Sequence, residues 1–305
     1  MPVTQPNTNT QSPHKVGYVA LVGRPNVGKS TLVNALLQFK LSIVTPKPQT
    51  TRHRILGILS EPGCQVIFLD TPGLIQPRYA LQAAMMRAAE RAMAEADIVV
   101  VLLDVSTPLQ EEDFQTLEQV KAHGKSLLIA LNKIDLINKA NLLPIIDQLA
   151  QRFPETEIIP ISALQRDGLD DLKAAIVQRL PEGMPLYPED QLTEHPERFF
   201  VAEIIRENIF ERYGEEIPYA TAVQIEEFKE RPGGKDFISA RIVVERPSQK
   251  AILIGKGGQA LKEVGKAARV EIEQFLGRPV FLKLWVAVRE KWRSDETLLR
   301  EYGYQ

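Results

Sequence analysis

The residues best suited to chemistry form a glycine-rich loop near the start of the chain. The loop reads Gly23-Arg24-Pro25-Asn26-Val27-Gly28-Lys29-Ser30. Glycines at this spacing let successive backbone N–H groups turn toward phosphate oxygens, and a helix that begins at the loop adds partial positive charge. We expect Lys29 to reach the β- and γ-phosphates of a nucleotide and the Ser30 hydroxyl to bind Mg²⁺. The loop therefore predicts a phosphate-binding site.

Three further motifs follow in an order that suits the same site. Asp70-Thr71-Pro72-Gly73 offers a carboxylate for Mg²⁺ and a backbone N–H for the γ-phosphate. In Asn132-Lys133-Ile134-Asp135, the Asp135 carboxylate can accept hydrogen bonds from N1–H and the exocyclic amine of guanine, a donor pair that adenine lacks. In Ser162-Ala163-Leu164, the Ala163 N–H can contact the base oxygen. Together these motifs predict a site for a guanine nucleotide.

The elements that must position these motifs alternate between strands and helices. Short runs rich in Val, Ile and Leu predict strands buried on both faces, at 16–22, 64–69, 98–103, 126–131 and 157–161. Helices are predicted between them at 29–38, 81–96, 111–122, 142–152 and 169–180. The run 55–59 before a Glu-Pro-Gly turn predicts a hairpin with the next strand. We therefore expect a mostly parallel six-stranded sheet with one antiparallel strand and helices on both faces.

The motifs and their order resemble those of translation-factor-related GTPases, and most closely the Era family. The closest local matches are the loop at 23–30, the segment Gln49-Thr50-Thr51-Arg52-His53 and the Asp70–Gly73 motif. The resemblance covers residues 16–293 and implies a Ras-like P-loop GTPase domain followed by an RNA-binding domain. It implies that residues 49–53 are the first switch, with a threonine on Mg²⁺. Thr51, next to Arg52, is favoured over Thr50.

The predicted site residues fall into three groups. The Mg²⁺ ligands are Ser30, Thr51 and Asp70, and the candidate catalytic groups are Asn26, Thr51 and Gly73. The ligands of GTP or GDP are Gly23, Arg24, Pro25, Asn26, Val27, Gly28, Lys29, Ser30, Thr31, Asp70, Thr71, Pro72, Gly73, Leu74, Asn132, Lys133, Asp135, Ser162, Ala163 and Leu164.

Hydrolysis needs an attacking water, and the residue that often orients it is missing. Many related enzymes place a glutamine directly after the Asp-x-x-Gly motif, where this chain has Leu74. A leucine cannot bind water, so we expect slow hydrolysis, another group or a partner. The resemblance makes an apolar residue there expected. It also points to Asn26, which in similar GTPases helps to bind K⁺. The alternative is that Asn26 only suits a tight turn.

The second half of the chain has a different order of elements. Residues 182–197 are proline-rich and acidic and predict a linker. Residues 198–293 then read helix, strand, strand, helix, helix, strand, which resembles a type II KH domain. Its GxxG loop is Ile254-Gly255-Lys256-Gly257-Gly258, and Lys262 follows on the next helix. Such a loop lets an RNA backbone approach a helix N-terminus. Trp285 is expected to pack inside this domain.

The balance of charge supports an RNA-binding surface around this loop. The whole chain carries a net charge of −2, but residues 246–293 hold 11 Lys or Arg against 4 Asp or Glu. Residues 198–245 hold 7 against 10. The Era resemblance implies the partner: the 3′ end of 16S ribosomal RNA, during maturation of the small ribosomal subunit. Residues 294–305 are read as a C-terminal tail, and the segment from Trp292 onward as a source of added contacts.

Composition bounds the remaining expectations. Apolar residues are 44% and charged residues 25%, the mix of a globular protein. A single cysteine, Cys64, excludes an internal disulfide and favours a reducing cytoplasm. We expect a monomer, with a disordered tail at 1–15 and a GTPase domain at 16–181. The sequence shows no membrane anchor and leaves a peripheral contact with the inner face of the cell membrane open.

Three other functions fit part of the pattern. The chain is either a GTP-hydrolysing RNA-binding protein or an RNA adaptor in which GTP only holds a conformation, as Leu74 would allow. An ATP-using phosphotransferase is a third reading, and the Asn132–Asp135 motif argues against it. A relative of the Era family that acts on another RNA is the fourth.

Overall fold

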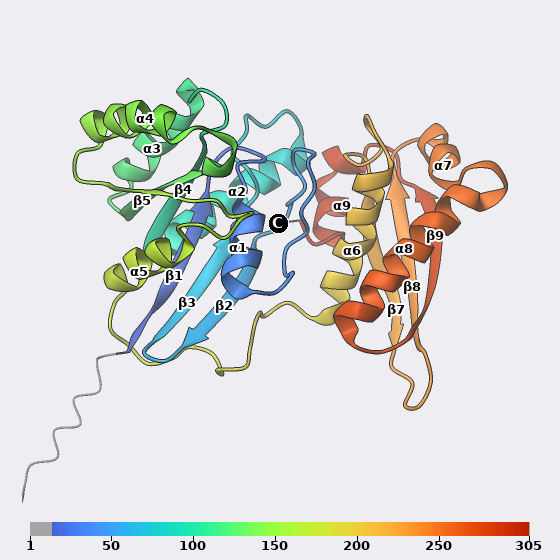
Figure 1. The fold of residues 1–305 in the computed structure, drawn as a ribbon. Coiled ribbons are helices and arrows are strands. Elements are labelled where there is room, and N and C mark those ends of the chain that lie inside the picture. Colours follow the sequence, from blue (N-terminus) through green and yellow to red (C-terminus); the bar gives the residue numbers. More distant parts are fainter. Residues whose placement is uncertain (1–13, 305) are drawn as a thin grey trace, which may run out of the picture.

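The computed structural model describes residues 14–304 and places them in two domains side by side (Figure 1). The predicted tail at 1–15 lies outside the described residues except for its last two. Of these, Lys15 already belongs to the first strand. Within the described residues, no helix is long and apolar enough to cross a membrane.

The first domain is a six-stranded sheet in the order β2-β3-β1-β4-β5-β6. Only β2 runs antiparallel to its neighbour, which confirms the predicted hairpin and the mostly parallel sheet. The strands are β1 (Lys15–Val22), β2 (Ile55–Glu61), β3 (Cys64–Asp70), β4 (Ile98–Asp104), β5 (Ser126–Asn132) and β6 (Glu157–Pro160).

Five helices cover the two faces of this sheet. Apolar side chains of α1 and α5 pack on one face, and those of α2, α3 and α4 pack on the other. The helices are α1 (Lys29–Leu37), α2 (Ala80–Glu95), α3 (Glu111–Ala122), α4 (Lys139–Arg152) and α5 (Leu169–Arg179). Because both faces are covered, the central strands are apolar throughout, as in the Ile-Val-Val-Val-Leu-Leu run of β4. Because these strands run parallel, their carboxyl ends lie at the same end of the sheet, and the predicted motifs follow there.

The second domain is a three-stranded sheet in the order β7-β8-β9, with helices on one face. Its strands are β7 (Ala222–Lys229), β8 (Asp236–Val244) and β9 (Val280–Val288), with β7 antiparallel and β9 parallel to β8. Its helices are α6 (Glu197–Arg212), α7 (Pro247–Ile254) and α8 (Gln259–Leu276), followed by α9 (Glu296–Glu301). The predicted order of elements is confirmed.

The segment predicted to be a linker is bound along the edge strand of the first sheet. The Ile58 N–H donates to the Leu192 carbonyl at 2.8 Å, and the Thr193 hydroxyl donates to the Leu56 carbonyl at 2.6 Å. The domain bounds 16–181, 182–197 and 198–293 stay predictions, but residues 182–197 are held to β2 over part of their length.

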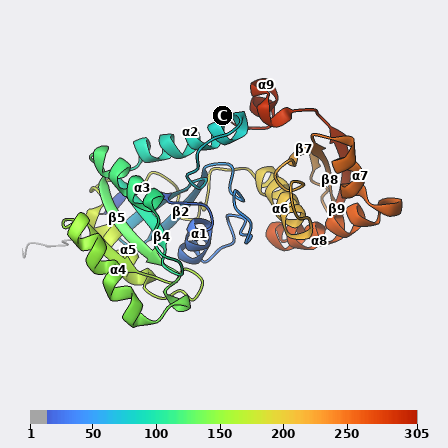
Figure 2. The ribbon, with the colours of Figure 1, turned by 90° about the horizontal axis from the view of Figure 1, so that it is seen from above.

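The predicted C-terminal tail is folded and joins the two domains. Trp292 is fully buried, and Tyr302 and Tyr304 are buried with it. These side chains pack with Leu81 and Met85 of α2 and with buried residues of the second sheet. Figure 2 shows α9 lying between the end of α2 and the second domain. This segment therefore contacts both the second sheet and the start of α2, the helix that follows the Asp70–Gly73 motif.

Candidate functional site

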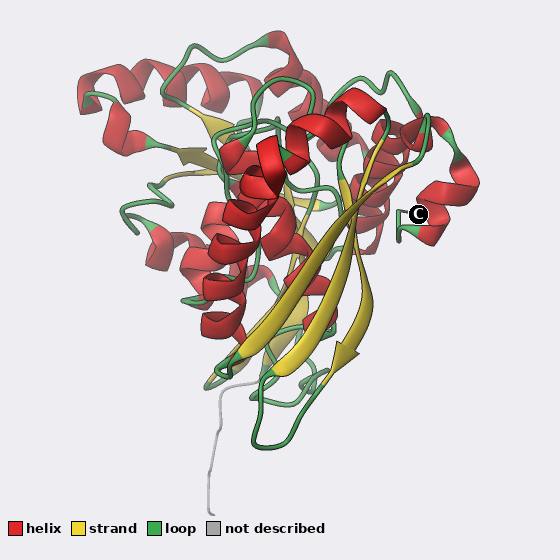
Figure 3. Cartoon of the chain, turned by 90° about the vertical axis from the view of Figure 1, so that its right-hand side faces the viewer, coloured by secondary structure: helices red, strands yellow, loops and turns green. Residues whose placement is uncertain are grey.

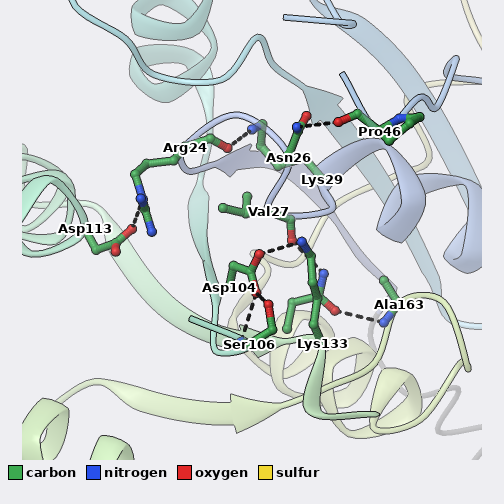
Figure 4. A network of polar contacts seen from close by, with 11 residues as sticks. Arg24, Asn26, Val27, Lys29, Pro46, Asp104, Ser106, Asp113, Lys133 and Ala163 are labelled. Atoms are coloured by element: carbon green, nitrogen blue, oxygen red, sulfur yellow. Dashed lines mark hydrogen bonds and ion pairs between the residues drawn. The ribbon is translucent and has the colours of Figure 1, made fainter. Parts of the chain in front are cut away.

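The glycine-rich loop joins β1 to α1 and is closed over by its own lysine (Figure 4). Lys29 is only 6% exposed. Its Nζ donates to the Gly23 carbonyl at 3.0 Å and to the Arg24 carbonyl at 2.9 Å. Burial lowers the pKa of Lys29 to about 8, against the attraction of Asp70. An ammonium group desolvated in this way gains more from a phosphate than one in water does.

Asn132 joins this loop to the segment that follows β6. Its Nδ2 donates to the Val27 carbonyl at 2.7 Å, and its Oδ1 accepts from the Ala163 N–H at 2.9 Å. Gly28 has a φ of 101°, and a Cβ there would lie 2.2 Å from the Asn132 amide nitrogen. Glycine is therefore needed at this position both for its backbone angle and for the close approach of Asn132.

The predicted guanine-reading residues are held by a second set of bonds. The Asp135 Oδ1 accepts from the Ser162 hydroxyl, which leaves the other carboxylate oxygen free of the serine. Lys133 forms an ion pair with Asp104, whose carboxylate also accepts from the Ser106 N–H at 3.0 Å. Leu164 lies at the surface, 71% exposed.

A Mg²⁺ ion fits the three residues predicted to bind it. The Ser30 and Thr51 hydroxyl oxygens lie 2.8 Å apart, whereas the Thr50 hydroxyl bonds Thr45 at 2.7 Å. The Asp70 carboxylate is fully buried, and neither of its oxygens has a hydrogen-bond partner within residues 14–304. Burial raises the pKa of Asp70, and the nearby Ser30 and Ser42 hydroxyls and then Lys29 oppose that rise. A buried carboxylate without a partner, next to two hydroxyls, is suited to a hard cation.

The Asp70–Gly73 motif packs against the glycine-rich loop. The Thr71 hydroxyl donates to the Leu21 carbonyl at 2.7 Å, and the Leu74 N–H donates to the Gly23 carbonyl at 3.0 Å. A Cβ at Gly73 would lie 2.6 Å from the Pro25 nitrogen. No larger residue fits there without moving the loop.

These segments enclose a cavity of about 280 Å³. Its lining comes from the glycine-rich loop, the predicted first switch, the Asp70–Gly73 motif and the guanine motif. The lining residues are Pro25, Asn26, Gly28, Lys29, Ser30, Thr31, Ile43, Val44, Thr45, Pro46, Gln49, Thr50, Thr51, Thr71, Gly73 and Lys133. Lys133 is the one lining residue from the guanine motif, and Ser162–Leu164 lie outside the lining. Those segments are joined to the glycine-rich loop through the hydrogen bonds of Asn132.

Two supports of the site were not predicted from the sequence. Arg24 donates to Asp113 and to Gln110, both at 2.7 Å, and so ties the glycine-rich loop to the start of α3. Asp104 holds Lys133. A charged residue at the carboxyl end of a buried strand was a signal for Asp104. Nothing in the spacing of Arg24 and Asp113 indicates that they meet.

The predicted first switch is bonded to the second domain, which was also not predicted. Arg52 is buried, and its guanidinium donates to the carbonyls of Thr221 at 2.7 Å and Pro218 at 2.9 Å. Lys47 donates to the Phe210 and Tyr213 carbonyls at the end of α6. These contacts hold both sides of the segment that carries Thr51.

Glu207 of α6 makes further contacts with the same region. Its carboxylate accepts from the Val44 N–H at 3.0 Å and pairs with Lys40 at 2.7 Å. The side chain is almost fully buried, and burial raises the pKa of Glu207 against the pull of Lys40. His53, at the end of the switch, stacks on Tyr304 with ring centroids 4.5 Å apart.

The predicted RNA-binding loop lies between α7 and α8. Gly255, Gly257 and Gly258 all have positive φ, and Lys256 and Lys262 are exposed. A groove of about 400 Å³ runs from this loop between α8 and β9, lined by Gly258, Leu261, Lys262, Gly265, Lys266, Arg269, Leu282 and Leu284. Ile254 is half-buried, and neither it nor residues 255–257 line this groove. Trp285 does not pack inside the domain: alternation along β9 places it on the opposite face, 38% exposed.

Two family models match the chain, one within each domain. Residues 18–133 match the family described as 50S ribosome-binding GTPase, and residues 216–293 match the KH domain. A GTPase ERA-like chloroplastic protein of Arabidopsis thaliana is 48% identical over 98% of this chain and 70% of its own length. GTPase Era of Geobacter metallireducens is 46% identical over 97% of this chain and 99% of its own.

Two solved structures have the same arrangement of domains. Aquifex aeolicus Era bound to GDP·AlF4⁻ is 44% identical, with a TM-score of 0.92 over 95% of this chain and 99% of that chain. Era in complex with MgGDPNP and nucleotides 1506–1542 of 16S ribosomal RNA is also 44% identical, with a TM-score of 0.93 over the same shares. The predicted GTPase domain, KH domain and family are confirmed. This chain belongs to the Era family of GTPases.

Proposed function

We propose that this chain hydrolyses GTP and, under control of the bound nucleotide, binds the 3′ end of 16S ribosomal RNA during maturation of the small ribosomal subunit. One observation carries the RNA partner. The chain is 44% identical, over nearly all its length, to an Era protein whose structure holds MgGDPNP and that RNA end. The guanine-nucleotide site and the GxxG groove supply the two binding sites that this function needs.

In the nucleotide site, we assign tasks to the main predicted residues. The loop N–H groups and Lys29 bind the phosphates. Ser30, Thr51 and Asp70 would hold Mg²⁺, which offsets negative charge on the β- and γ-phosphates. Asp135 would accept hydrogen bonds from the guanine edge. Asn132 joins the Ser162–Leu164 segment to the glycine-rich loop through its bonds to Ala163 and Val27. Gly73 packs against Pro25 of the loop, and its N–H would bind the γ-phosphate.

We propose that hydrolysis proceeds without a glutamine and depends on K⁺ near Asn26. The Leu74 side chain has no polar atom to orient a water, and it packs on the core of the first domain. The Asn26 amide donates to the Pro46 carbonyl of the switch segment at 2.8 Å, which places two oxygen-bearing groups together beside the loop. The backbone angle of Asn26, with φ of 64°, equally suits a residue chosen for a turn.

Replacing K⁺ by Na⁺ at equal ionic strength separates the two roles of Asn26. If it serves K⁺, turnover falls in Na⁺, and Asn26→Asp changes the dependence on the cation. If it only forms a turn, turnover is the same in both salts. Single-turnover hydrolysis with and without RNA also tests the adaptor reading, which predicts no phosphate release in either case.

We propose that the bound nucleotide acts on the second domain through the switch itself. GTP would hold Thr51 on Mg²⁺, and the same segment is fastened to α6 and to the residues before β7 by Lys47, Arg52 and Glu207. Loss of the γ-phosphate frees Thr51 and weakens those bonds, as in other GTPase switches. The linker would let the domains reorient, and identical scattering profiles with GDP and a GTP analogue would count against that part.

RNA binding is tested with a short RNA of the 16S 3′ end and a scrambled control. Fluorescence anisotropy should give tighter binding of the native sequence, and Lys256→Glu should weaken both by adding charge repulsion at the loop. Competition by GTP but not ATP tests the nucleotide assignment. Equal affinity for both RNAs would favour another RNA as the partner.

We also infer a reducing cytoplasm, because the single cysteine forms no internal disulfide and is buried. We propose that the protein is a monomer. Light scattering tests the monomer. Sedimentation with vesicles of neutral or anionic lipid tests the peripheral membrane contact, which electrostatic attraction would confine to the anionic vesicles.

A further inference from the structure

The second sheet has one face that helices α6, α7 and α8 do not cover, and aromatic side chains lie on it. Helices α6, α7 and α8 pack on the other face, where Ile238 and Ile242 are fully buried. Side chains alternate along a strand, so Phe237, Phe281 and Trp285 point away from those helices. Phe281 is 53% exposed and Trp285 is 38% exposed. Figure 3 is turned toward this side of the molecule, where the three strands run in front.

Only one end of this face is used by the chain itself. Val243 and Ala222, farther along the strands, are buried under Trp292 and Leu299 of the C-terminal segment. That segment does not cover Phe281, so docking of the C-terminus does not account for the exposed aromatic side chains. We call Phe237, Phe281, Lys283 and Trp285 the aromatic patch.

Cations lie among these rings. Phe237 and Phe281 stack with centroids 5.8 Å apart and planes 12° apart, and the Arg231 guanidinium lies 5.4 Å from the Phe237 ring. Lys283 is exposed on β9 between Phe281 and Trp285. Aromatic rings interleaved with cations are what sequence-tolerant single-strand binding surfaces use.

The acidic side chain of Glu226 lies on β7, beside the aromatic patch, and limits where a negatively charged ligand can bind. Glu226 accepts from the Trp285 indole N–H at 2.7 Å and lies 3.6 Å from Arg241. The indole is thereby held in place. The Arg241 guanidinium lies 5.8 Å from the Trp285 ring centroid and is paired with Glu226 and Glu301. The cations left for a ligand are Arg231 and Lys283, so a polyanion would lie along β8 and β9 rather than over β7.

The patch is continuous with the GxxG groove through a single strand. Leu282 and Leu284 of β9 line the groove, while Phe281, Lys283 and Trp285 of the same strand form the patch. Within residues 14–304, strand β9 pairs only with β8, so no strand pairs with its other edge. An RNA strand that leaves the groove therefore crosses only β9 to reach the patch. Phe281 and Trp285 are roughly 13 Å apart along that strand.

We propose that the aromatic patch stacks unpaired bases of single-stranded RNA that continues beyond the GxxG groove. This proposal rests on the proposed RNA binding and extends the footprint past the about four nucleotides that a KH groove takes. RNA, rather than an apolar partner protein, suits the alternation of rings and cations on β9.

Trp285 provides a direct signal for the test. The chain has two tryptophans, and Trp292 is fully buried while Trp285 is partly exposed. In the full-length protein with a GTP analogue, a 12-nucleotide single-stranded RNA ending in the 16S 3′ sequence should quench indole fluorescence. A four-nucleotide RNA that fits the groove should bind without that quenching. No quenching by the longer RNA at saturation overturns the proposal.

Affinities of variants complete the test. Trp285→Ala and Phe281→Ala should each weaken binding of the 12-nucleotide RNA about 5- to 30-fold, the lower part of the range for losing one stacked base. Trp285→Phe should keep most of the affinity, and Leu143→Ala, a change of an exposed apolar side chain in α4, should keep all of it.

The two proposals fail in different ways. If the alanine variants bind both RNAs as the parent does, or lose the four-nucleotide RNA equally, the patch is not a stacking surface. If the parent protein binds neither RNA, the proposed RNA function itself fails.

Discussion

At the scale of single residues, the choice of base depends on Asp135. Its carboxylate is fixed by Ser162 and offers only acceptors to the guanine edge. Asp135→Asn places an amide donor against the guanine donors. We expect the affinity for GTP to fall at least about 100-fold, from the loss of charge-assisted hydrogen bonds, and the affinity for xanthosine triphosphate to rise. Nucleotide competition measures both.

A matched control is Asp147→Asn, which removes an exposed carboxylate from α4. It should bind GTP as the parent protein does. Unchanged selectivity in the Asp135 variant would mean that another residue reads the base.

Lys29 predicts a proton taken up with the nucleotide. Burial lowers its pKa to about 8 in the free protein, and phosphates favour the charged amine, so binding raises that pKa. At pH 8.5 part of the free protein carries a neutral Lys29 and gains a fraction of a proton on binding MgGDP; at pH 6.5 it is already charged. Calorimetry in buffers of different ionisation enthalpy should show a heat of MgGDP binding that depends on the buffer at the higher pH, because Lys29 takes up a proton. The same heats in every buffer at pH 8.5 would contradict this.

The same shift has a consequence for stability. The folded pKa of Lys29 lies below its ordinary value of 10.5, so the unfolded chain binds more protons between about pH 8 and 10.5. The contribution of Lys29 to the free energy of unfolding therefore rises with pH across that window.

At the scale of elements, the sequence predicted the strands and helices well because their patterns are local. Val-rich buried runs and the 3.6-residue period placed all of the predicted elements within a few residues. The phosphate loop was also predictable, since its chemistry lies in consecutive residues. The contacts of Arg24 with Asp113 and of Arg52 with Thr221 join residues 89 and 169 positions apart, and no local pattern encodes such pairs.

Trp285 and the C-terminal segment show the same limit. An apolar residue in a strand belongs to one of two faces, and which face is covered depends on the helices that pack there. The C-terminal sequence is largely polar and was therefore read as a tail. The packing of Trp292, Tyr302 and Tyr304 against α2 was not predicted.

The switch segment gives a prediction at this scale. Arg52→Ala removes the bonds to the Pro218 and Thr221 carbonyls and loosens the segment that carries Thr51. We expect the preference for a GTP analogue over GDP to fall about 5- to 30-fold, within the usual range of coupling between sites. Arg54→Ala is the matched control, because Arg54 pairs with Glu95 within the first domain. Equal effects of the two changes would argue against the contact with the second domain.

At the scale of the whole molecule, the C-terminal segment binds the domains together. Trp292 is fully buried, and its indole donates to the Ala220 carbonyl at 2.9 Å. Trp292→Ala should lower the free energy of unfolding by about 3–5 kcal/mol, whereas Trp285→Ala should lower it much less because that side chain is partly exposed. Denaturant titration compares the two, and a similar loss in both would mean that the segment is not part of the core.

The central claim is that a guanine nucleotide controls RNA binding through the switch segment. It is tested most directly by the affinity of the full-length protein for the 12-nucleotide 16S 3′-end RNA, measured with saturating MgGDP and with a saturating Mg²⁺ complex of a GTP analogue. We predict tighter binding with the analogue, by about 5- to 150-fold, and a smaller ratio in Arg52→Ala. Equal affinities in the two nucleotide states would contradict the claim.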